Sequence, residues 1–262
     1  MNLGSPQSQG DPGEFGLIVA AQVSELWWAL IVRELRTAQE QLRADNLTEA
    51  SRSLRRAVTH FEPLNATLRS IAWMTPNRLF VLLSRVSVQL GQDTAFQGPI
   101  HRQLIDLLGL QQVDQLQPAP SRSRRRERPS PALAAEPSLY DDVLAYLSRI
   151  GLTVPAHLLE RTAGSPYVPN ETIEQIWREI YEDPYPDVPL QQLGDTLAEI
   201  ANAFTDWTGR LRKTTRRAFT GRSPVAKGGE TSAPTFDELP FPDLWLARGF
   251  IGSAPEAHPL AA

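Results

Sequence analysis

The sequence predicts an all-α protein, built as a bundle of long helices with shorter helices packed across it. Apolar side chains recur at three- and four-residue steps over long segments. Pro, Gly and Asn separate these segments where helix ends are expected, and no segment alternates as a strand does. The 262 residues are 41% apolar, which is enough to bury a sizeable core. We therefore expect a single helical domain over residues 15–250, with flexible tails at 1–14 and 251–262.

The first half of the chain contains four predicted helices. The first is unusually apolar towards its beginning, which predicts burial on several sides. Asn46 is expected to cap the second helix, and Pro76 and Pro99 are expected to begin the third and fourth. The predicted ranges are 15–43, 47–72, 77–90 and 98–108. The expected core stripe of the first helix is Val19, Val23, Leu26, Leu30, Val32 and Leu35.

Residues 117–138 are rich in Pro and Arg and predict a solvated loop within the domain. A basic run can instead bind RNA or a membrane surface. No aromatic residue is interleaved with its arginines, so a base-stacking platform is not indicated.

Helical periodicity resumes at Leu139 and continues to Phe250. Asn170 is expected to cap one of these helices, and a long one ends before Gly221. The predicted ranges are 139–150, 155–161, 170–183, 190–219 and 241–250. The expected core stripe of the helix 190–219 is Leu193, Leu197, Ile200, Ala201, Phe204 and Trp207.

The composition excludes several classes of protein. Cysteine is absent, so disulfide scaffolds, thiolate metal sites and cysteine nucleophiles are excluded. The net charge of −4 gives no reason to expect nucleic acid as a partner. The apolar stretch 15–21 has seven residues, no apolar run is longer, and seven residues are too few to span a bilayer. We expect a cytoplasmic protein with no membrane partner.

A series of short motifs runs in order along residues 15–250. The motifs are Gln22–Trp28, Arg33–Leu35, Met74–Pro76, Phe96–Gln97, Pro137–Asp141, Gly151–Glu160, Trp177–Pro184, Ala203–Trp207 and Phe241–Trp245. In order and spacing they resemble the signatures of the tryptophan 2,3-dioxygenase superfamily. The resemblance implies an all-helical haem protein, usually tetrameric, that inserts dioxygen into the indole ring of L-tryptophan.

Two histidines define the active site of that family, and both are replaced here. The resemblance places Ala21 at the distal position and Leu211 at the axial position, or Arg212 if the alignment shifts by one residue. Leucine has no lone pair to donate, and arginine stays protonated. Haem is possible only with another ligand, and no other cofactor is expected.

The resemblance also implies a pocket for an aromatic amino acid or a derivative. Its substrate-binding positions are Leu17, Ala21, Arg85, Phe96 and Thr231. Arg85 is the candidate for holding the substrate carboxylate. Thr231 lies in a shortened version of the loop that closes over the substrate.

His101 and Asp93 are the candidate catalytic residues. His101 follows Phe96 by five residues, so its imidazole can be a displaced haem ligand, a general base or a packed core side chain. Asp93 can act as a base or cap a helix. His60 is expected to be structural, and His157 and His258 to be exposed. No two histidines have the spacing of a metal pair on one helix, so no metal site is predicted.

These observations leave two hypotheses for function. One is a repurposed enzyme of specialised metabolism that acts on an aromatic amino acid of the tryptophan or tyrosine type. The other is a non-catalytic protein that binds a ligand or supports an active paralogue. Either would assemble as a homo-oligomer or as a hetero-oligomer with that paralogue.

Overall fold

The computed structural model describes residues 12–90, 96, 98–110, 136–162, 165, 167–184, 187–219 and 239–250. These residues form nine helices and contain no strand, which confirms the all-α class. The helices are α1 (Pro12–Arg43), α2 (Leu47–Arg69), α3 (Pro76–Leu90), α4 (Pro99–Leu107), α5 (Leu139–Arg149), α6 (Ala156–Leu159), α7 (Glu171–Glu182), α8 (Val188–Phe219) and α9 (Pro242–Phe250).

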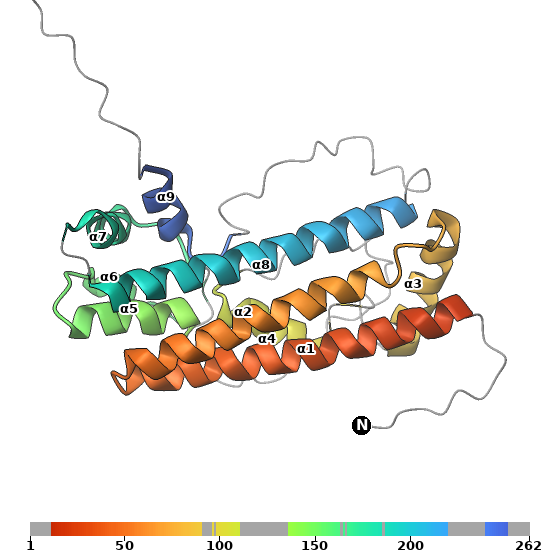
Figure 1. Ribbon diagram of the computed structural model, residues 1–262, viewed down its shortest axis with the longest axis horizontal. Coiled ribbons are helices and arrows are strands. Elements are labelled where there is room, and N and C mark those ends of the chain that lie inside the picture. Colours follow the sequence, from red (N-terminus) through yellow and green to blue (C-terminus); the bar gives the residue numbers. More distant parts are fainter. Residues whose placement is uncertain are drawn as a thin grey trace, which may run out of the picture.

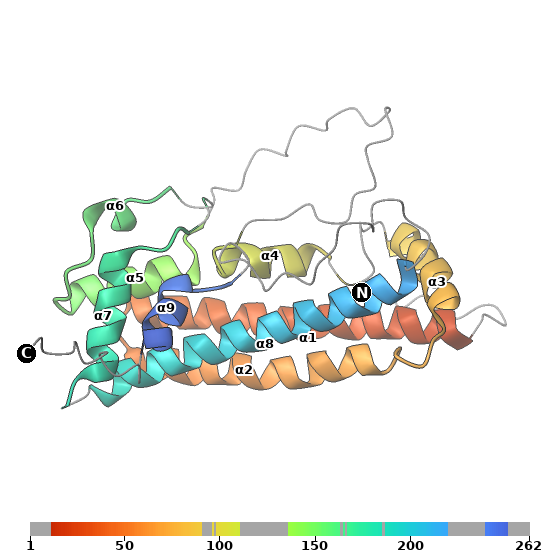
Figure 2. The ribbon, with the colours of Figure 1, turned by 90° about the horizontal axis from the view of Figure 1, so that it is seen from above.

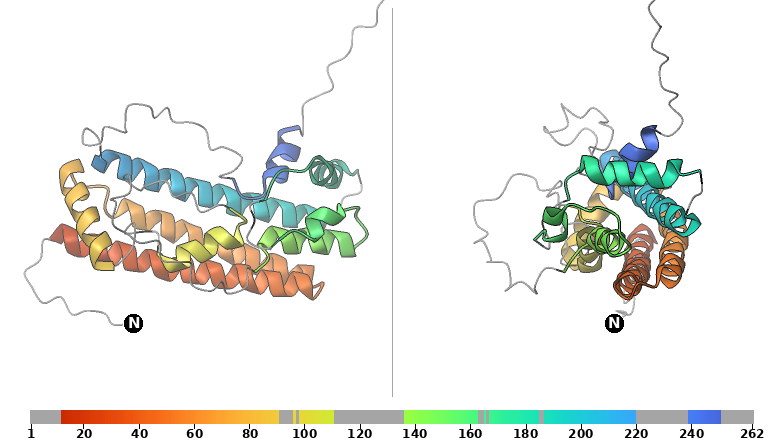
Figure 3. Two further views of the ribbon diagram at one scale, coloured as in Figure 1. Left: turned by 180° about the vertical axis from the view of Figure 1, so that it is seen from behind. Right: turned by 90° about the vertical axis from the view of Figure 1, so that its left-hand side faces the viewer.

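Three long helices form the body of the molecule (Figure 1). α2 packs against both α1 and α8, and α8 runs antiparallel to α1. α3 crosses one end of the bundle and contacts α1 and α8, while α4 lies along α1 (Figure 2). α5, α6, α7 and α9 gather at the opposite end (Figure 3). The α3 end and the α9 end therefore differ in both helix content and packing.

Local capping fixes several helix boundaries where the sequence predicts them. The side chain of Asn46 accepts a hydrogen bond from the backbone N–H of Glu49 at the start of α2. Asn170 caps α7 in the same way. Ser138 forms a reciprocal capping box with Asp141 at α5, so orphan amides are satisfied at these helix starts.

Two expectations for the first helix are wrong. Residues 12–14 are helical, so α1 begins three residues before the predicted start. Three members of the expected core stripe face outward, with exposed fractions of 38% for Val19, 47% for Leu26 and 42% for Leu30. The neighbouring helices cover another face, which carries Trp28 and Leu35. Periodicity identified the apolar positions of α1, and packing decided which of them are covered.

α1 also bears on the question of a membrane. Although its longest uninterrupted apolar run is short, Gly13–Arg43 includes an 18-residue window with a mean hydropathy of 1.7, enough by length and composition to cross a bilayer. Of that window, 39% is buried inside the bundle. A core helix of a soluble protein meets the same criterion, so this finding is weak support for a membrane span.

Several predicted features lie outside the described residues. Among the candidate residues these are Asp93, Thr231 and His258. Most of the loop 117–138 and the whole of 251–262 also lie there.

Candidate functional site

A cluster of aromatic rings occupies the centre of the bundle, where α1, α4 and α8 meet. Trp28 of α1 and Trp207 of α8 make an edge-to-face contact, with ring centroids 4.5 Å apart. The His101 ring of α4 lies 5.2 Å from each of these two indoles. Phe61 and Phe204 complete the cluster at 6.1 Å from Trp28 and 6.5 Å from His101. Such offset pairs stabilise the core beyond their buried area.

Helical spacing explains why these rings meet. Residues three, four and seven apart share one face of a helix. On α1 that face carries Leu17, Ala21, Ser24 and Trp28, all buried. On α8 the predicted core stripe is confirmed and continues by one turn, since Leu193, Leu197, Ile200, Ala201, Phe204, Trp207 and Leu211 are all buried.

His101 is the one buried histidine among the described residues, at 5% exposure. Burial and, to a smaller extent, the nearby charge of Arg102 lower its pKa to about 4, so the ring is neutral at pH 7. Its Nε2 is buried without a hydrogen-bond partner in the described part of the chain. The indole N–H groups of Trp28 and Trp207 are also without partners there. One small cluster thus contains three unsatisfied nitrogens, each of which carries a desolvation cost.

The two positions at which the resemblance expects histidines lie beside this cluster. Because α1 and α8 are antiparallel, Ala21 and Leu211 both lie towards the α3 end from the Trp28–Trp207 contact (Figure 2). Along the helix axes they are about 10 Å and about 6 Å from it. Ala21 is 1% exposed and Leu211 is 4% exposed, whereas Arg212 is exposed. The inward-facing position on α8 is therefore Leu211, and an aliphatic side chain fills it.

These residues do not fit haem. Ala21 and Leu211 offer no electron pair to iron. His101 has a neutral ring, but its Nε2 is buried and indoles pack against the ring. Within the described ranges, no group of three or more His, Asp or Glu side chains is placed to hold a metal ion.

The other predicted site residues are only partly brought together. Leu17 and Phe96 are buried in the same core as Ala21. Arg85 is different, because its side chain is 56% exposed and pairs with Glu14 at the start of α1, at 3.0 Å. A role for Arg85 in holding a substrate carboxylate stays a prediction, and in this structure its guanidinium has another partner.

The remaining histidines have structural or surface positions. His60 is half-buried on α2, and its ring centroid lies 5.9 Å from that of Trp27. His157 is exposed on the short helix α6, as predicted. Neither histidine reaches the aromatic cluster, which is built from α1, α2, α4 and α8.

Sequence reasoning missed a second buried polar cluster, at the α9 end. Asp243 is fully buried and accepts hydrogen bonds from the Tyr140 hydroxyl at 3.0 Å and from the backbone N–H of Asn170 at 2.6 Å. Trp177 donates its indole N–H to the same Tyr140 oxygen at 3.0 Å. Burial raises the pKa of Asp243, while these hydrogen bonds lower it. We call Tyr140, Trp177 and Asp243 the α9 clasp, because they join α5, α7 and α9.

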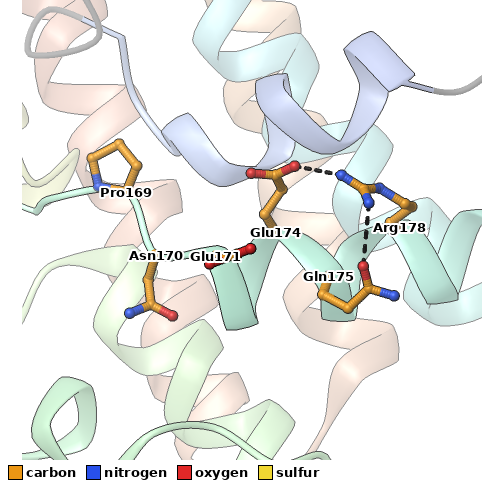
Figure 4. Close-up of a pocket in the computed structure, with 6 residues that line it drawn as sticks. All are labelled: Pro169, Asn170, Glu171, Glu174, Gln175 and Arg178. Carbon is orange, nitrogen blue, oxygen red and sulfur yellow. Dashed lines mark hydrogen bonds and ion pairs between the residues drawn. The ribbon is translucent and has the colours of Figure 1, made fainter.

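A surface cleft of about 490 Å³ also lies at the α9 end, along the start of α7 (Figure 4). Its single basic side chain, Arg178, is held by Glu174 at 2.5 Å and by Gln175 at 3.3 Å. Neighbours on the same helix hold the arginine, and the other charged side chains of the cleft are the carboxylates of Glu171 and Glu174. The aromatic cluster remains the candidate site.

Comparison with known proteins agrees with this architecture. The family model described as tryptophan 2,3-dioxygenase matches residues 2–121. A tryptophan 2,3-dioxygenase from Burkholderia lata is 34% identical over 242 residues, covering 91% of this chain and 76% of the relative. One from Ralstonia pickettii is 31% identical over 250 residues, covering 95% of this chain and 88% of the relative.

Proposed function

Because the chain belongs to the tryptophan 2,3-dioxygenase family, we propose that it is a haem-independent member of it. Its role would be to bind an aromatic amino acid or a derivative without oxidising it. The observation that carries this proposal is the pair Ala21 and Leu211, two buried aliphatic side chains at the positions of the family's histidines. Family membership establishes the fold, whereas activity depends on the side chains at the site.

The packing of the site supports this proposal. Leu211 is part of the continuous buried face of α8, and Ala21 is part of that of α1. A macrocycle between them would have to displace side chains that now fill the core, and protein interiors tolerate such changes poorly. The proposal therefore rests on packing as well as on the missing donor atoms.

His101 favours binding over catalysis. A general base must come within hydrogen-bond reach of the proton that it removes. The Nε2 of His101 is buried, and its ring contacts Trp28 and Trp207. This enclosure is typical of a packed core histidine.

Assembly is the second part of the proposal. We propose that the protein works in the cytoplasm as an oligomer, either of its own chains or with an active paralogue. The lack of cysteine is compatible with a reducing compartment. Exposed apolar side chains on α1 support association with another chain.

Ligand binding and turnover can be tested together. L-Tryptophan and L-tyrosine are titrated into the haem-free protein by calorimetry, and each is then followed by chromatography with oxygen, haem and reductant present. We expect saturable binding and no loss of amino acid. Leu17→Ala should weaken binding, whereas Leu159→Ala, which changes an exposed leucine on α6, should not. Oxidation of tryptophan by the wild-type protein would contradict the proposal.

A repurposed enzyme is the second candidate, and one observation favours it. His101 is neutral at pH 7 and its Nε2 has no partner among the described residues, so it can accept a proton. This candidate predicts turnover of an aromatic amino acid that is lost in His101→Phe while ligand binding persists. Equal turnover in the wild type and His101→Phe would exclude His101 as the base.

A further inference from the structure

Four buried polar atoms without described partners lie where α1, α4 and α8 meet. Three are the nitrogens of the aromatic cluster, and the fourth is Oε1 of Glu25. Glu25 lies three residues before Trp28, so the two are neighbours on the surface of α1. Burial raises the pKa of Glu25, while a hydrogen bond from the backbone N–H of Gly98 and the charge of Arg102 lower it, which places this carboxyl at the start of α4. Such a group of unpaired polar atoms is rare in a native core.

His101 belongs to the least firmly held helix around the cluster. Trp28 and Trp207 lie on the long helices α1 and α8, each of which also packs against α2. α4 has nine residues, and among the described helices it packs closely against α1 alone. Its buried side chains are His101, Leu104 and Leu107. An element with so few buried apolar contacts separates from its neighbours more readily than the rest of the core.

A histidine is also an unfavourable side chain for a permanent core position. Nε2 of His101 has left water without gaining a partner among the described residues. The charged groups that face the ring are Arg102 on its own helix and Glu25 on α1. The α8 side chains that contact it, Phe204 and Trp207, do not titrate. Nothing in these surroundings pairs with the imidazole, so the ring is suited to leaving.

We propose that the ring of an aromatic amino acid takes the place of the His101 imidazole beside Trp28 and Trp207, as α4 moves away from α1. The unliganded protein is then autoinhibited by its own histidine. This inference rests on the ligand binding proposed above, and it specifies where the ligand's ring lies. Exchanging one ring for another preserves the offset contacts that the two indoles make at 5.2 Å.

The polar atoms that stay behind favour an amino acid as the ligand. When the His101 ring leaves, α1 and α8 keep the indole N–H groups of Trp28 and Trp207, which are donors, and Oε1 of Glu25, which is an acceptor. An α-carboxylate can accept from the indoles, and an α-ammonium can donate to Glu25. An amino acid with a flat ring therefore supplies the ring, the acceptor and the donor together, whereas indole alone supplies no charged group.

Proton uptake on binding is the direct test. The pKa of His101 is about 4 in the core and should return to about 6.5 in water, so binding should take up a proton between these values. L-Tryptophan is titrated by calorimetry into the haem-free, full-length wild type. We expect about 8-fold tighter binding at pH 5.5 than at pH 7, relative to His101→Ala, which keeps Glu25 and so provides the baseline. His157→Ala, at an exposed histidine on α6, should behave as the wild type.

A measurement on the wild type alone gives the same information. At pH 5.5, titrations in two buffers with different ionisation enthalpies count the protons taken up, and His101 should contribute about 0.9 proton per amino acid bound. At pH 7, His101→Ala should bind L-tryptophan at least about 10-fold more tightly than the wild type, because no side chain has to leave. Indole should bind the wild type at least about 10-fold more weakly than L-tryptophan.

The outcomes separate this inference from the proposed function. Binding of L-tryptophan without proton uptake, or with the same pH response in the wild type and His101→Ala, would overturn the inference and leave the proposed function standing. A wild type that binds no aromatic amino acid at either pH would overturn both. Equal affinity for indole and L-tryptophan would overturn the assignment of an amino acid as the ligand.

Discussion

The α9 end of the bundle and the aromatic cluster at its centre differ in how their buried polar groups are paired. In the α9 clasp, the carboxylate of Asp243, the hydroxyl of Tyr140 and the indole N–H of Trp177 satisfy one another. In the aromatic cluster, the nitrogens of His101, Trp28 and Trp207 have no partner among the described residues. Fully paired polar groups in a core give specificity and rigidity, whereas unpaired ones cost stability. The α9 clasp is therefore a satisfied polar scaffold, whereas the aromatic cluster carries unpaired polar groups.

Removing the acceptor of the α9 clasp should have the largest effect. Asp243→Ala would leave the Tyr140 hydroxyl and the Asn170 N–H buried without an acceptor. We expect a loss of about 3 kcal/mol or more in the free energy of unfolding, measured in urea, since each orphaned donor costs about 1–3 kcal/mol. Asp206→Ala, an exposed change on α8, should be nearly neutral. A loss no larger than that of the control would mean that the clasp is not structural.

Acidification should destabilise the aromatic cluster through His101. Its pKa is about 4 in the folded protein and about 6.5 when unfolded, so the unfolded chain binds more protons between these values. The contribution of His101 is fully present above pH 6.5 and is lost as the pH falls towards 4. It amounts to about 3 kcal/mol over that window.

The measurement is the difference in urea stability between the wild type and His101→Phe across pH 4 to 7. We expect the wild type to lose more stability than the variant as the pH falls. His157→Phe, at an exposed histidine, should follow the wild type. Parallel curves for the wild type and His101→Phe would show that the ring is not buried as a neutral group.

Two matched tryptophan substitutions compare the α9 clasp and the aromatic cluster directly, and their expected effect is the smallest. Trp177→Phe removes a donor that Tyr140 uses, whereas Trp207→Phe removes an N–H without a described partner. Both also lose volume in the core, so the comparison isolates the hydrogen bond. We expect Trp177→Phe to be the more destabilising by about 1 kcal/mol in thermal or urea unfolding. Equal losses would indicate that the two indoles are equally well satisfied.

Much of the fold could be predicted from the sequence, because local chemistry fixes helix ends. Asn46 and Asn170 identify the starts of α2 and α7, and the apolar stripe of α8 is buried as its spacing predicts. The exposure of Leu26 could not be predicted in this way, because periodicity identifies an apolar face of a helix but not which other helices cover it. The partners in the α9 clasp were also missed, since Tyr140 and Asp243 are 103 residues apart in sequence.

The candidate site was predictable in its positions but not in its packing. The resemblance located Ala21 and Leu211, and both are buried. It did not show that the His101 ring would contact the indoles of Trp28 and Trp207, because that contact depends on how α4 packs against α1 and α8. Whether His101 is a haem ligand, a general base or a packed core side chain depends on how closely its neighbours surround the ring. The packing of the helices decides this, and the sequence does not show it.

Haem titration followed at the Soret band tests the central claim most directly, namely that this family member has no residue placed to ligate haem. Haem is added stepwise to the purified wild-type protein, and the spectrum is compared with that of free haem. The account predicts no saturable spectrum of histidine-ligated haem. A Soret transition that saturates at one haem per chain, and that disappears in His101→Ala, would contradict it.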